Sequence, residues 1–417
     1  MNLTSRPEAV PASAARASRA RERSLFRRCL PASVVALAIT SLMLAGATAS
    51  AAAARSLVSS PAAAIPQVTL LAVSCPTDGF CMAIGRALTS AEDAAPVALS
   101  WNGRAWTARR FPIPAHAVGT WPAAVSCTSA RYCIAVGWYG PGNTARPAQF
   151  AARWNGRTWT VVLTRRAGML AAVSCSAYNA CTAVGTDGSE NYMPTNEVAE
   201  RWNGRTWTSQ RVPAFGGPSA ITFSGVACTS ATACLAVGSD WDYGDYTMPI
   251  SARWTRGKWK AVIIRYKDPD SEDYADALSC SSGSACTAIG YSTDPGGDVY
   301  VPLAERWNGN RWGVQPVSGA VSFFGGLSCP QARMCMAVSG AQTELWNGTR
   351  WTVKTSVNPV AHAYLTAVAC RSTTLCIGVG SVGTTDGGNA TLAERWNGTT
   401  WVSYRTPAGP PTALVRR

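Results

Sequence analysis

The sequence predicts an all-β fold in which a four-stranded antiparallel unit is repeated seven times, and two observations lead to this prediction. Cysteines recur as seven C-x5-C pairs and tryptophans as seven W-x4-W pairs, and the two series alternate strictly along the chain. The spacing between successive units runs between 39 and 53 residues. Such units, repeated seven times, indicate a seven-bladed β-propeller. An open sandwich or a linear array of the same units is the structural alternative.

The residues before the repeats are typical of an export signal followed by a lead-in. A basic start precedes an apolar run from Leu30 to Ala45, and Ala47-Thr48-Ala49 fits an A-x-A cleavage site. We therefore expect a signal peptide over residues 1–49 and a flexible Ala/Ser/Pro-rich lead-in over residues 50–66. Arg27-Arg28 partly matches a twin-arginine export motif. A retained membrane anchor is the alternative, although the run of ~16 residues is shorter than the ~20 that a spanning helix needs.

The third copy of the repeat shows how four strands follow from the residues. Leu170 to Cys175 and Cys181 to Gly185 are short β-type runs on either side of a five-residue turn. After a polar segment of variable length, Val198 to Trp202 and Trp207 to Arg211 flank an Asn-Gly turn. Asn-Gly supplies the positive φ angles of a tight hairpin. The unit therefore consists of four short strands joined by hairpins, and no helical periodicity is found after the signal.

The spacing within the unit has a physical reading. Cysteines six residues apart across a hairpin can lie opposite each other, at a short Cα separation that suits a disulfide. The paired tryptophans fall on one face of the sheet, either opposite or diagonal to each other, so that their rings can pack. Cys181, Ala183 and Gly185 are small side chains at alternate positions. We attribute these small side chains to the convergence of the sheets towards the narrow central axis of the ring.

The repeats resemble those of secreted bacterial proteins with the pattern V-S-C…C-x-A-V-G…E-R-W-N-G-x-x-W, over roughly residues 68–407. They are also similar to kelch and galactose-oxidase-like propellers in repeat length and strand count. The resemblance implies a fold and no defined activity. The predicted propeller covers residues 67–408, followed by a tail over 409–417, with units at about 67–114, 121–165, 168–213, 221–266, 274–317, 321–357 and 363–408. The ring is expected to close either by face packing alone or with the blade frame shifted by one hairpin.

Composition excludes some classes of function. With 47% hydrophobic and 14% charged residues, the chain does not have the profile of a disordered protein. The net charge is +14, but the first 30 residues hold seven arginines and no basic run of five or more follows. A dedicated nucleic-acid surface is therefore not expected. Because His116 and His362 are the only histidines, multi-histidine metal chemistry and histidine-based catalysis are disfavoured.

The cysteines are interpreted as structural disulfides rather than as metal or redox sites. Every cysteine except Cys29 occupies the same position in its repeat, as expected for an exported disulfide-bonded chain. C-x5-C lacks the C-x2-C spacing of zinc sites, and no histidine accompanies it. The predicted pairs are Cys75–Cys81, Cys127–Cys133, Cys175–Cys181, Cys228–Cys234, Cys280–Cys286, Cys329–Cys335 and Cys370–Cys376.

The repeat tryptophans are interpreted as packing between blades, with sugar stacking as the alternative. Trp121, Trp138 and Trp241 fall outside the repeat positions and are more informative about function. Four glutamates stand two residues before a repeat tryptophan, and arginines often stand directly before it. These charges, which include Glu200 and Glu305, are interpreted as ion pairs at blade edges.

Connections within a propeller blade alternate between two faces. The cysteine turns and Asn-Gly turns lie on one face, and the longer, divergent segments lie on the other, where binding sites are usually placed. Acidic and aromatic residues are concentrated in the divergent segments. The candidate ligand-binding residues are Trp138, Tyr139, Tyr192, Asp240, Trp241, Asp242, Tyr243, Asp245, Tyr246, Asp294, Asp298 and Tyr300.

Three interpretations of these segments remain open. Aromatic rings beside carboxylates suit carbohydrate recognition, through stacking and hydrogen bonds to hydroxyls. Clustered carboxylates could instead hold Ca²⁺, although Asp268-x-Asp270-x-Glu272 lacks the glycine and the final glutamate of an EF-hand loop. The third interpretation is a set of solvated polar loops. No other cofactor is expected.

The sequence predicts a secreted, disulfide-stabilised propeller that acts as an extracellular recognition module. The expected partner is a carbohydrate or cell-surface polymer, and the protein is expected to be a monomer without a stable membrane span after processing. A secreted glycosidase or lyase that uses loop carboxylates is the second hypothesis, and a structural wall-associated role is the third. No catalytic residues are assigned, and the residues required for a galactose-oxidase-like copper site or a sialidase-like hairpin are missing.

Overall fold

The computed structural model describes residues 67–88, 94–141, 146–162, 166–188, 196–213, 215, 219–242, 247–264, 271–293, 299–317, 324–354 and 362–407. The predicted signal peptide and lead-in, and the tail over 409–417, lie outside these residues. All described strands belong to one unit, Ala62–Arg417, and no described residue is helical. The prediction of an all-β fold is confirmed.

The described strands form seven antiparallel sheets of four strands each, here called blades one to seven in chain order. Blade one contains β1 (Gln67–Thr77), β2 (Phe80–Leu88), β3 (Ala94–Trp101) and β4 (Trp106–Arg109). Blade two contains β5 (Ala117–Ser129), β6 (Tyr132–Pro141), β7 (Ala148–Trp154) and β8 (Trp159–Val162). Blade three contains β9 (Met169–Ala177), β10 (Ala180–Thr186), β11 (Glu197–Trp202) and β12 (Trp207–Gln210). Blade four contains β13 (Ser219–Ser230), β14 (Ala233–Asp242), β15 (Thr247–Thr255) and β16 (Lys258–Ile263). Blade five contains β17 (Asp273–Ser282), β18 (Ala285–Thr293), β19 (Tyr300–Trp307) and β20 (Trp312–Gln315). Blade six contains β21 (Gly326–Gln331), β22 (Met334–Ser339), β23 (Gln342–Trp346) and β24 (Trp351–Lys354). Blade seven contains β25 (Ala363–Ser372), β26 (Leu375–Gly383), β27 (Asn389–Trp396) and β28 (Trp401–Tyr404).

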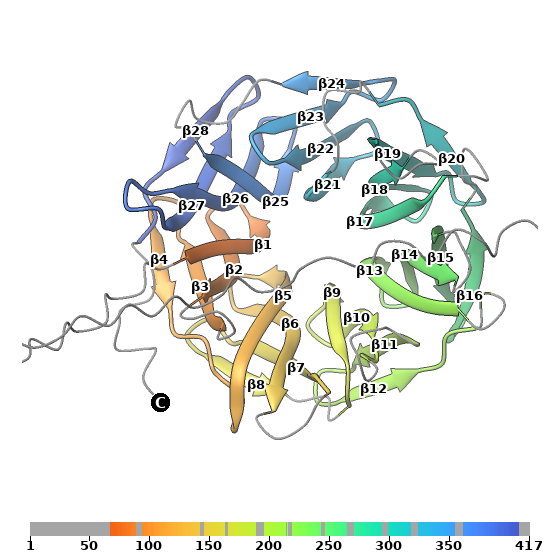
Figure 1. Ribbon diagram of the computed structural model, residues 1–417, viewed down its shortest axis with the longest axis horizontal. Coiled ribbons are helices and arrows are strands. Elements are labelled where there is room, and N and C mark those ends of the chain that lie inside the picture. Colours follow the sequence, from red (N-terminus) through yellow and green to blue (C-terminus); the bar gives the residue numbers. More distant parts are fainter. Residues whose placement is uncertain are drawn as a thin grey trace, which may run out of the picture. The chain divides into compact units, whose positions relative to one another are not determined.

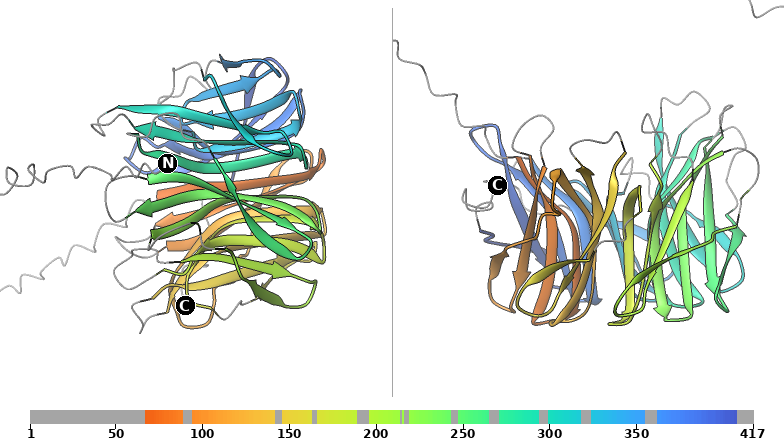
Figure 2. Two further views of the ribbon diagram at one scale, coloured as in Figure 1. Left: turned by 90° about the vertical axis from the view of Figure 1, so that its right-hand side faces the viewer. Right: turned by 90° about the horizontal axis from the view of Figure 1, so that it is seen from below.

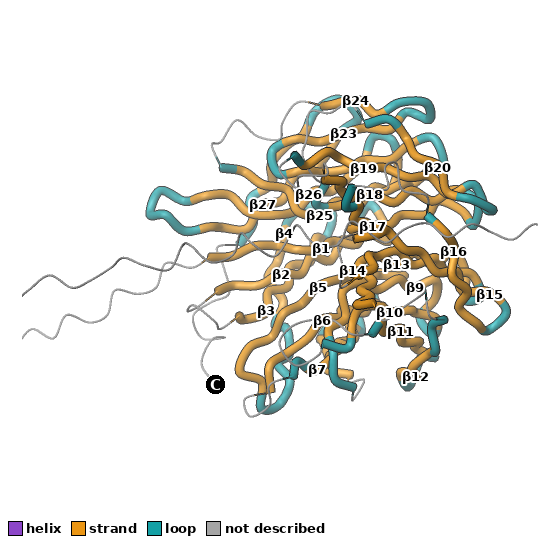
Figure 3. Tube along the Cα trace, turned by 45° about the vertical axis from the view of Figure 1, so that its right-hand side comes forward, coloured by secondary structure: helices purple, strands orange, loops and turns teal. Residues whose placement is uncertain are grey.

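The blades are arranged in a ring, with the first strand of each blade innermost (Figure 1). Each first strand contacts the first strand of the next blade, and β25 of blade seven contacts β1 of blade one. The strands run between the two faces of the ring, and tight turns gather on one of these faces (Figure 2). Strand accounts for most of the described chain (Figure 3). The predicted seven-bladed propeller is confirmed.

The ring closes between two complete blades, so that no blade combines strands from the two ends of the chain. Blade one is built from the N-terminal repeat and blade seven from the C-terminal one. A single parallel bridge between Gln67 and Asn389 joins β1 to β27. Gln67 Nε2 donates a hydrogen bond to Gly387 O at 3.2 Å, and Thr366 Oγ1 donates one to Leu70 O. Packing and a few polar contacts therefore close the ring.

The cysteines and tryptophans of each blade lie in one row across its four strands. In blade three, Cys175 lies opposite Cys181, Cys181 opposite Trp202, and Trp202 opposite Trp207. All seven predicted disulfides form, with Cα separations of 3.9–4.1 Å. The paired tryptophan rings are 5.5–5.8 Å apart in every blade, and twelve of the fourteen are buried. The role of these tryptophans is packing, and the two members of each pair lie directly opposite each other rather than diagonally.

The structural reason for the glycine of the C-x-A-x-G pattern differs from the one predicted. Six first strands carry a β-bulge opposite this glycine, which brings their backbone close to it. A Cβ atom on Gly290 would lie 1.8 Å from Tyr274 O, and one on Gly185 would lie 2.0 Å from Met169 O. Only glycine fits such an approach. The bulge, rather than a narrow axis, explains the glycine.

Serine hydroxyls join neighbouring blades. Ser279 stands before the first cysteine of blade five, and its Oγ accepts a hydrogen bond from Cys329 N of blade six at 2.9 Å. The same bond recurs at four other blade junctions. Blades four and seven have Ala227 and Ala369 at this position. There the bulge hydroxyls of Ser224 and Thr366 donate instead to a backbone carbonyl of the next blade.

The interpretation of the third-strand charges as ion pairs is wrong. Three of the five arginines that precede a repeat tryptophan, Arg201, Arg253 and Arg306, lie over a tryptophan of the next blade. The guanidinium carbon of Arg201 is 4.6 Å from the ring centroid of Trp254. The four glutamates are almost fully buried, and none forms an ion pair with a described residue. Because alternate residues of a strand point to opposite faces, the arginine and glutamate of one blade face different neighbours.

Candidate functional site

The ring has two faces with different chemistry. The turn face is formed by the residues between the paired cysteines and between the paired tryptophans, all of which are described. These hairpins hold ten basic residues and one acidic residue. The basic residues are Arg104, Arg131, Arg157, Arg205, Arg256, Lys258, Arg311, Arg333, Arg350 and Arg371, and the acidic residue is Asp78. The opposite, divergent face is formed by the connections between second and third strands and between blades.

The predicted ligand-binding residues are only partly described. Trp138 and Tyr139 lie on β6, Asp240 on β14 and Tyr300 on β19, so these four are spread over blades two, four and five. Asp240 is 5% exposed, whereas Tyr300 is 51% exposed. For Trp241 and Asp242 the structure describes the strand but not the side chains. The others, Tyr192, Tyr243, Asp245, Tyr246, Asp294 and Asp298, lie outside the described residues.

A pair of stacked tryptophans lies at the divergent end of blade two. Trp121 on β5 is directly opposite Trp138 on β6, with ring centroids 4.0 Å apart and ring planes at 10°. Gly119 leaves room for the Trp121 ring, because a Cβ atom at this position would lie 2.3 Å from it. Both rings are half-buried. The structure therefore supplies Trp138 with a partner that the candidate residues did not include.

Blade five carries three tyrosines at the corresponding end, here called the tyrosine cluster: Tyr274, Tyr291 and Tyr300. Tyr274 on β17 is opposite Tyr291 on β18, with ring centroids 4.5 Å apart and planes at 19°. Tyr300 lies 5.5 Å from Tyr291. The Tyr274 hydroxyl donates to Glu272 Oε2 at 2.9 Å and accepts from Thr247 Oγ1 at 3.3 Å. A half-exposed aromatic surface is thus held beside a carboxylate.

The two aromatic pairs occupy the same position in the repeat. Each first member stands before the bulge of the first strand, and each second member directly follows the glycine of the second strand. Tyr364 of blade seven takes the first of these positions and is 53% exposed. The signal in the sequence is an aromatic residue after Cys-x-Ala-x-Gly, as in Gly137-Trp138 and Gly290-Tyr291.

Burial changes the ionisation of the groups around the tyrosine cluster. Desolvation raises the pKa of Tyr291 to about 12, and the charges of Asp276 and Glu272 add to this effect. Asp276, which occupies the bulge of β17, is solvent-exposed, although the surrounding protein raises its pKa to about 6. At neutral pH Tyr291 is therefore a neutral phenol beside carboxylate groups.

A second group of carboxylates lies between blades three and four. Burial raises the pKa of Glu197, and the charges of Asp187 and Asp240 raise it further. Asp187 accepts hydrogen bonds from Asn196 through both carboxylate oxygens, at 3.2 and 2.8 Å. No group of three His, Cys, Asp or Glu side chains suited to a metal ion is found among the described residues. Ca²⁺ binding therefore stays a prediction for the divergent segments.

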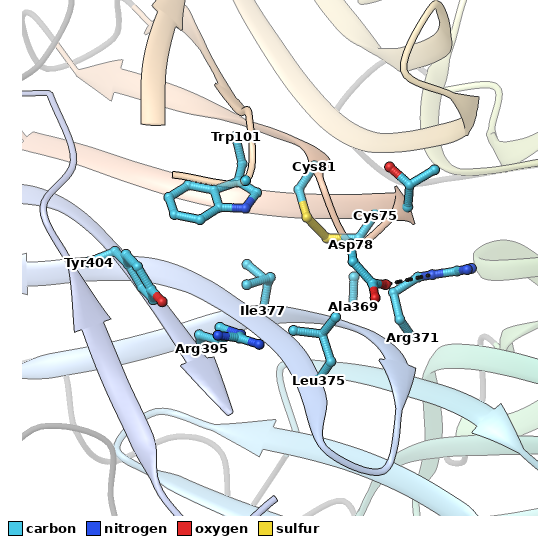
Figure 4. Close-up of a pocket in the computed structure, with 12 residues that line it drawn as sticks. Cys75, Asp78, Cys81, Trp101, Ala369, Arg371, Leu375, Ile377, Arg395 and Tyr404 are labelled. Atoms are coloured by element: carbon cyan, nitrogen blue, oxygen red, sulfur yellow. Dashed lines mark ion pairs between the residues drawn. A yellow bond between two sulfur atoms is a disulfide. The ribbon is translucent and has the colours of Figure 1, made fainter. Parts of the chain in front are cut away.

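A pocket of about 140 Å³ lies on the turn-face side where blades one and seven meet (Figure 4). The Cys75–Cys81 disulfide forms part of its wall, and Tyr404 packs edge-on against Trp101 with ring centroids 4.9 Å apart. Arg371 Nε lies 3.7 Å from Asp78 Oδ1, so that an ion pair crosses the seam. These contacts give the pocket a structural role in ring closure.

Comparisons with known proteins agree with the fold. No protein-family model and no curated protein matches the chain. A solved structure described as YCF48 bound to D1 peptide is 14% identical, with a TM-score of 0.50, and the match covers 81% of this chain and 99% of that chain. The WD40 beta propeller domain of Doa1 is 12% identical, with a TM-score of 0.48 and coverage of 78% and 96%. The SapL1 lectin in complex with alpha methyl fucoside is 11% identical, with a TM-score of 0.44 and coverage of 83% and 98%. At these identities the likeness concerns the fold alone.

Seven disulfides are typical of a protein that works in an oxidising compartment. The described residues include no helix with the length and hydropathy of a membrane span.

Proposed function

We propose that this protein is a secreted recognition module that binds carbohydrate on its divergent face, with the tyrosine cluster of blade five as one contact surface. The observation that carries the proposal is the arrangement of Tyr291 and Tyr300 beside Glu272 and Asp276. Flat aromatic rings stack against the C–H faces of a sugar ring, and carboxylates accept hydrogen bonds from its hydroxyls. The sequence-predicted residues Trp241 to Tyr246 of blade four are included in the proposed surface.

The position of the cluster in the ring supports this role. Tyr291 shares a strand face with Ile289, which packs against residues of blade six. β18 and β22 both begin one residue before their cysteine, but β18 ends at Thr293 after nine residues and β22 ends at Ser339 after six. Blade six therefore covers less of blade five near this end. Tyr300 and its neighbours Val299 and Val301 are 44–53% exposed, as a binding surface requires.

The proposal is tested by a glycan array probed with the wild-type protein and two single variants. Tyr300→Ala removes an exposed ring from the cluster, and Tyr178→Ala is the matched control, because Tyr178 is 64% exposed on the turn face. We expect Tyr300→Ala to weaken binding by roughly tenfold, the equivalent of about 1.4 kcal/mol. Tyr178→Ala should bind like the wild type.

Two outcomes would contradict the proposal. If no glycan is bound by the wild type, or if both variants bind equally well, the cluster is not a carbohydrate surface. If the wild-type protein hydrolyses a polysaccharide panel, recognition is not its main activity and the glycosidase or lyase hypothesis replaces it.

A further inference from the structure

The turn face carries a charge that folding does not require. In each Trp-Asn-Gly turn the asparagine Oδ1 accepts hydrogen bonds from the next backbone N–H groups, as Asn155 does from Arg157 and Thr158 at 2.9 Å. Asn397 makes the same bonds at 2.9 Å, although threonines follow it. The turn therefore forms with either a basic or a neutral residue. Arginines at this position are free to serve another purpose.

One pocket brings an arginine of this face, Arg157, together with two arginines of blade one, Arg109 at the end of β4 and Arg110 directly after it. It lies between blades one and two, has a volume of about 380 Å³, and is lined by Arg109, Arg110 and Arg157 together with Trp154 and Trp159. Pro112, Ile113 and Thr158 complete its described lining, which includes no carboxylate. In contrast to the seam pocket, where Asp78 pairs with Arg371, the positive charge here is uncompensated by any described lining residue.

Arg109 is held in place before any ligand binds, and the backbone that carries Arg157 is fixed by a turn. Arg109 Nε donates to Ser100 Oγ at 2.7 Å, and its guanidinium carbon lies 5.8 Å from the centroid of Trp154. Ser100 stands where five of the other blades have an arginine before the repeat tryptophan. Arg109 therefore covers the neighbouring tryptophan from β4. Arg157 is carried by the hydrogen-bonded turn of Asn155. A preorganised guanidinium loses little entropy on binding an oxyanion.

The surroundings favour a polymer over a small anion. The pocket adjoins a face on which ten basic side chains oppose one carboxylate, and these hairpins are spread around the ring. A chain with repeated negative charges can contact several of them at once. An anionic membrane is less suited, because Tyr178 is the one large apolar side chain exposed in these hairpins, all of which are described. The disulfides are typical of an oxidising, extracellular compartment, where DNA is not the usual polyanion.

We propose that the turn face binds an acidic polysaccharide, and that the pocket of Arg109, Arg110 and Arg157 holds one of its sulfate or carboxylate groups. This surface does not include the tyrosine cluster of blade five, to which the proposed function refers. The protein would then bind two different glycans on two separate surfaces of the ring.

The test uses immobilised dextran sulfate, polygalacturonate and neutral dextran at about 0.1 M salt. Binding to one or both charged polymers and not to dextran is expected, and the preferred polymer identifies the sulfate or the carboxylate. The variant Arg110→Gln/Arg157→Gln should weaken this binding roughly tenfold. The control is Arg205→Gln/Arg211→Gln. It removes two charges from the same repeat positions, but these two arginines lie at different blade junctions and do not share a pocket. The control should weaken binding no more than about threefold.

Several results would overturn the proposal. Equal losses in the two double variants would show a general charge effect without a pocket. Absence of binding to both charged polymers, or tighter binding to anionic vesicles or to double-stranded DNA, would reject an acidic polysaccharide as the partner. Because Tyr300→Ala should leave dextran sulfate binding unchanged, failure of this proposal and failure of the proposed function can be told apart.

Discussion

Glu305 offers a quantitative test of how the blades are packed. It is 3% exposed, and neither of its carboxylate oxygens has a hydrogen-bond partner among the described residues. Desolvation, reinforced by the charge of Asp273, raises its pKa from 4.5 to about 8. Glu305 is therefore protonated in the folded protein at neutral pH but ionised in the unfolded chain.

The sign and size of the pH effect follow from this difference. Below a pH of about 4.5 both states are protonated, and Glu305 costs no stability. Between 4.5 and about 8 only the unfolded chain ionises, so the free energy of unfolding falls by up to ~1.4 kcal/mol per pH unit. The full loss is about 5 kcal/mol, and about 2.5 kcal/mol of it falls between pH 5 and pH 7. Glu305→Gln, which cannot ionise, should remove this contribution.

The measurement is guanidinium unfolding of the disulfide-bonded protein at pH 5, 6 and 7, followed by tryptophan fluorescence. The stability of Glu305→Gln relative to wild type should rise by about 2.5 kcal/mol from pH 5 to pH 7. Glu200→Gln is the matched control, because Glu200 occupies the same position in blade three but accepts a hydrogen bond from Ser209 Oγ at 2.7 Å. Its pKa is also raised by burial, with Ser209 acting against the shift, so a smaller pH dependence is expected. The reasoning is refuted if Glu305→Gln and wild type keep a constant difference over this range.

Two further substitutions test other parts of the framework by the same unfolding measurement. Gly290→Ala should destabilise the protein by more than ~2 kcal/mol, because the new Cβ atom would lie 1.8 Å from Tyr274 O. Gly313→Ala is the control, since no atom lies within 4 Å of its new Cβ, and its stability should stay within about 0.5 kcal/mol of wild type. Equal effects of the two substitutions would show that the backbone approach at the bulge is not tight. Ser279→Ala leaves Cys329 N without its acceptor across the blade junction and should cost about 1–2 kcal/mol; an unchanged midpoint would mean that water or another group replaces the hydroxyl.

The framework was predictable from the sequence because its signals lie within one repeat. Cysteines and tryptophans at fixed spacing define two hairpins, and both the disulfides and the Trp–Trp contacts follow from the strand geometry. Contacts between blades leave no such local signal. The adjacency of Glu200 and Arg201 in the sequence predicts an ion pair, but the two side chains face different neighbouring blades and do not pair. The repeat pattern likewise shows that a glycine recurs at the position of Gly185, but it does not reveal the bulge on the neighbouring strand that requires this glycine.

The candidate site was harder to predict, because it depends on the neighbouring blade as much as on its own residues. The sequence predicts Tyr300 as a site residue because it is an aromatic residue in a divergent segment. It does not predict Tyr274 and Tyr291, because a strand residue is ordinarily covered by the next blade. The turn face cannot vary in length, because the row of cysteines and tryptophans and the asparagine turns fix every blade at that end. Length differences therefore accumulate at the divergent end, where β22 and β23 of blade six are joined by Gly340 and Ala341 alone. A short blade uncovers the strand ends of its neighbour, so the exposed surface of blade five arises from residues that blade six lacks.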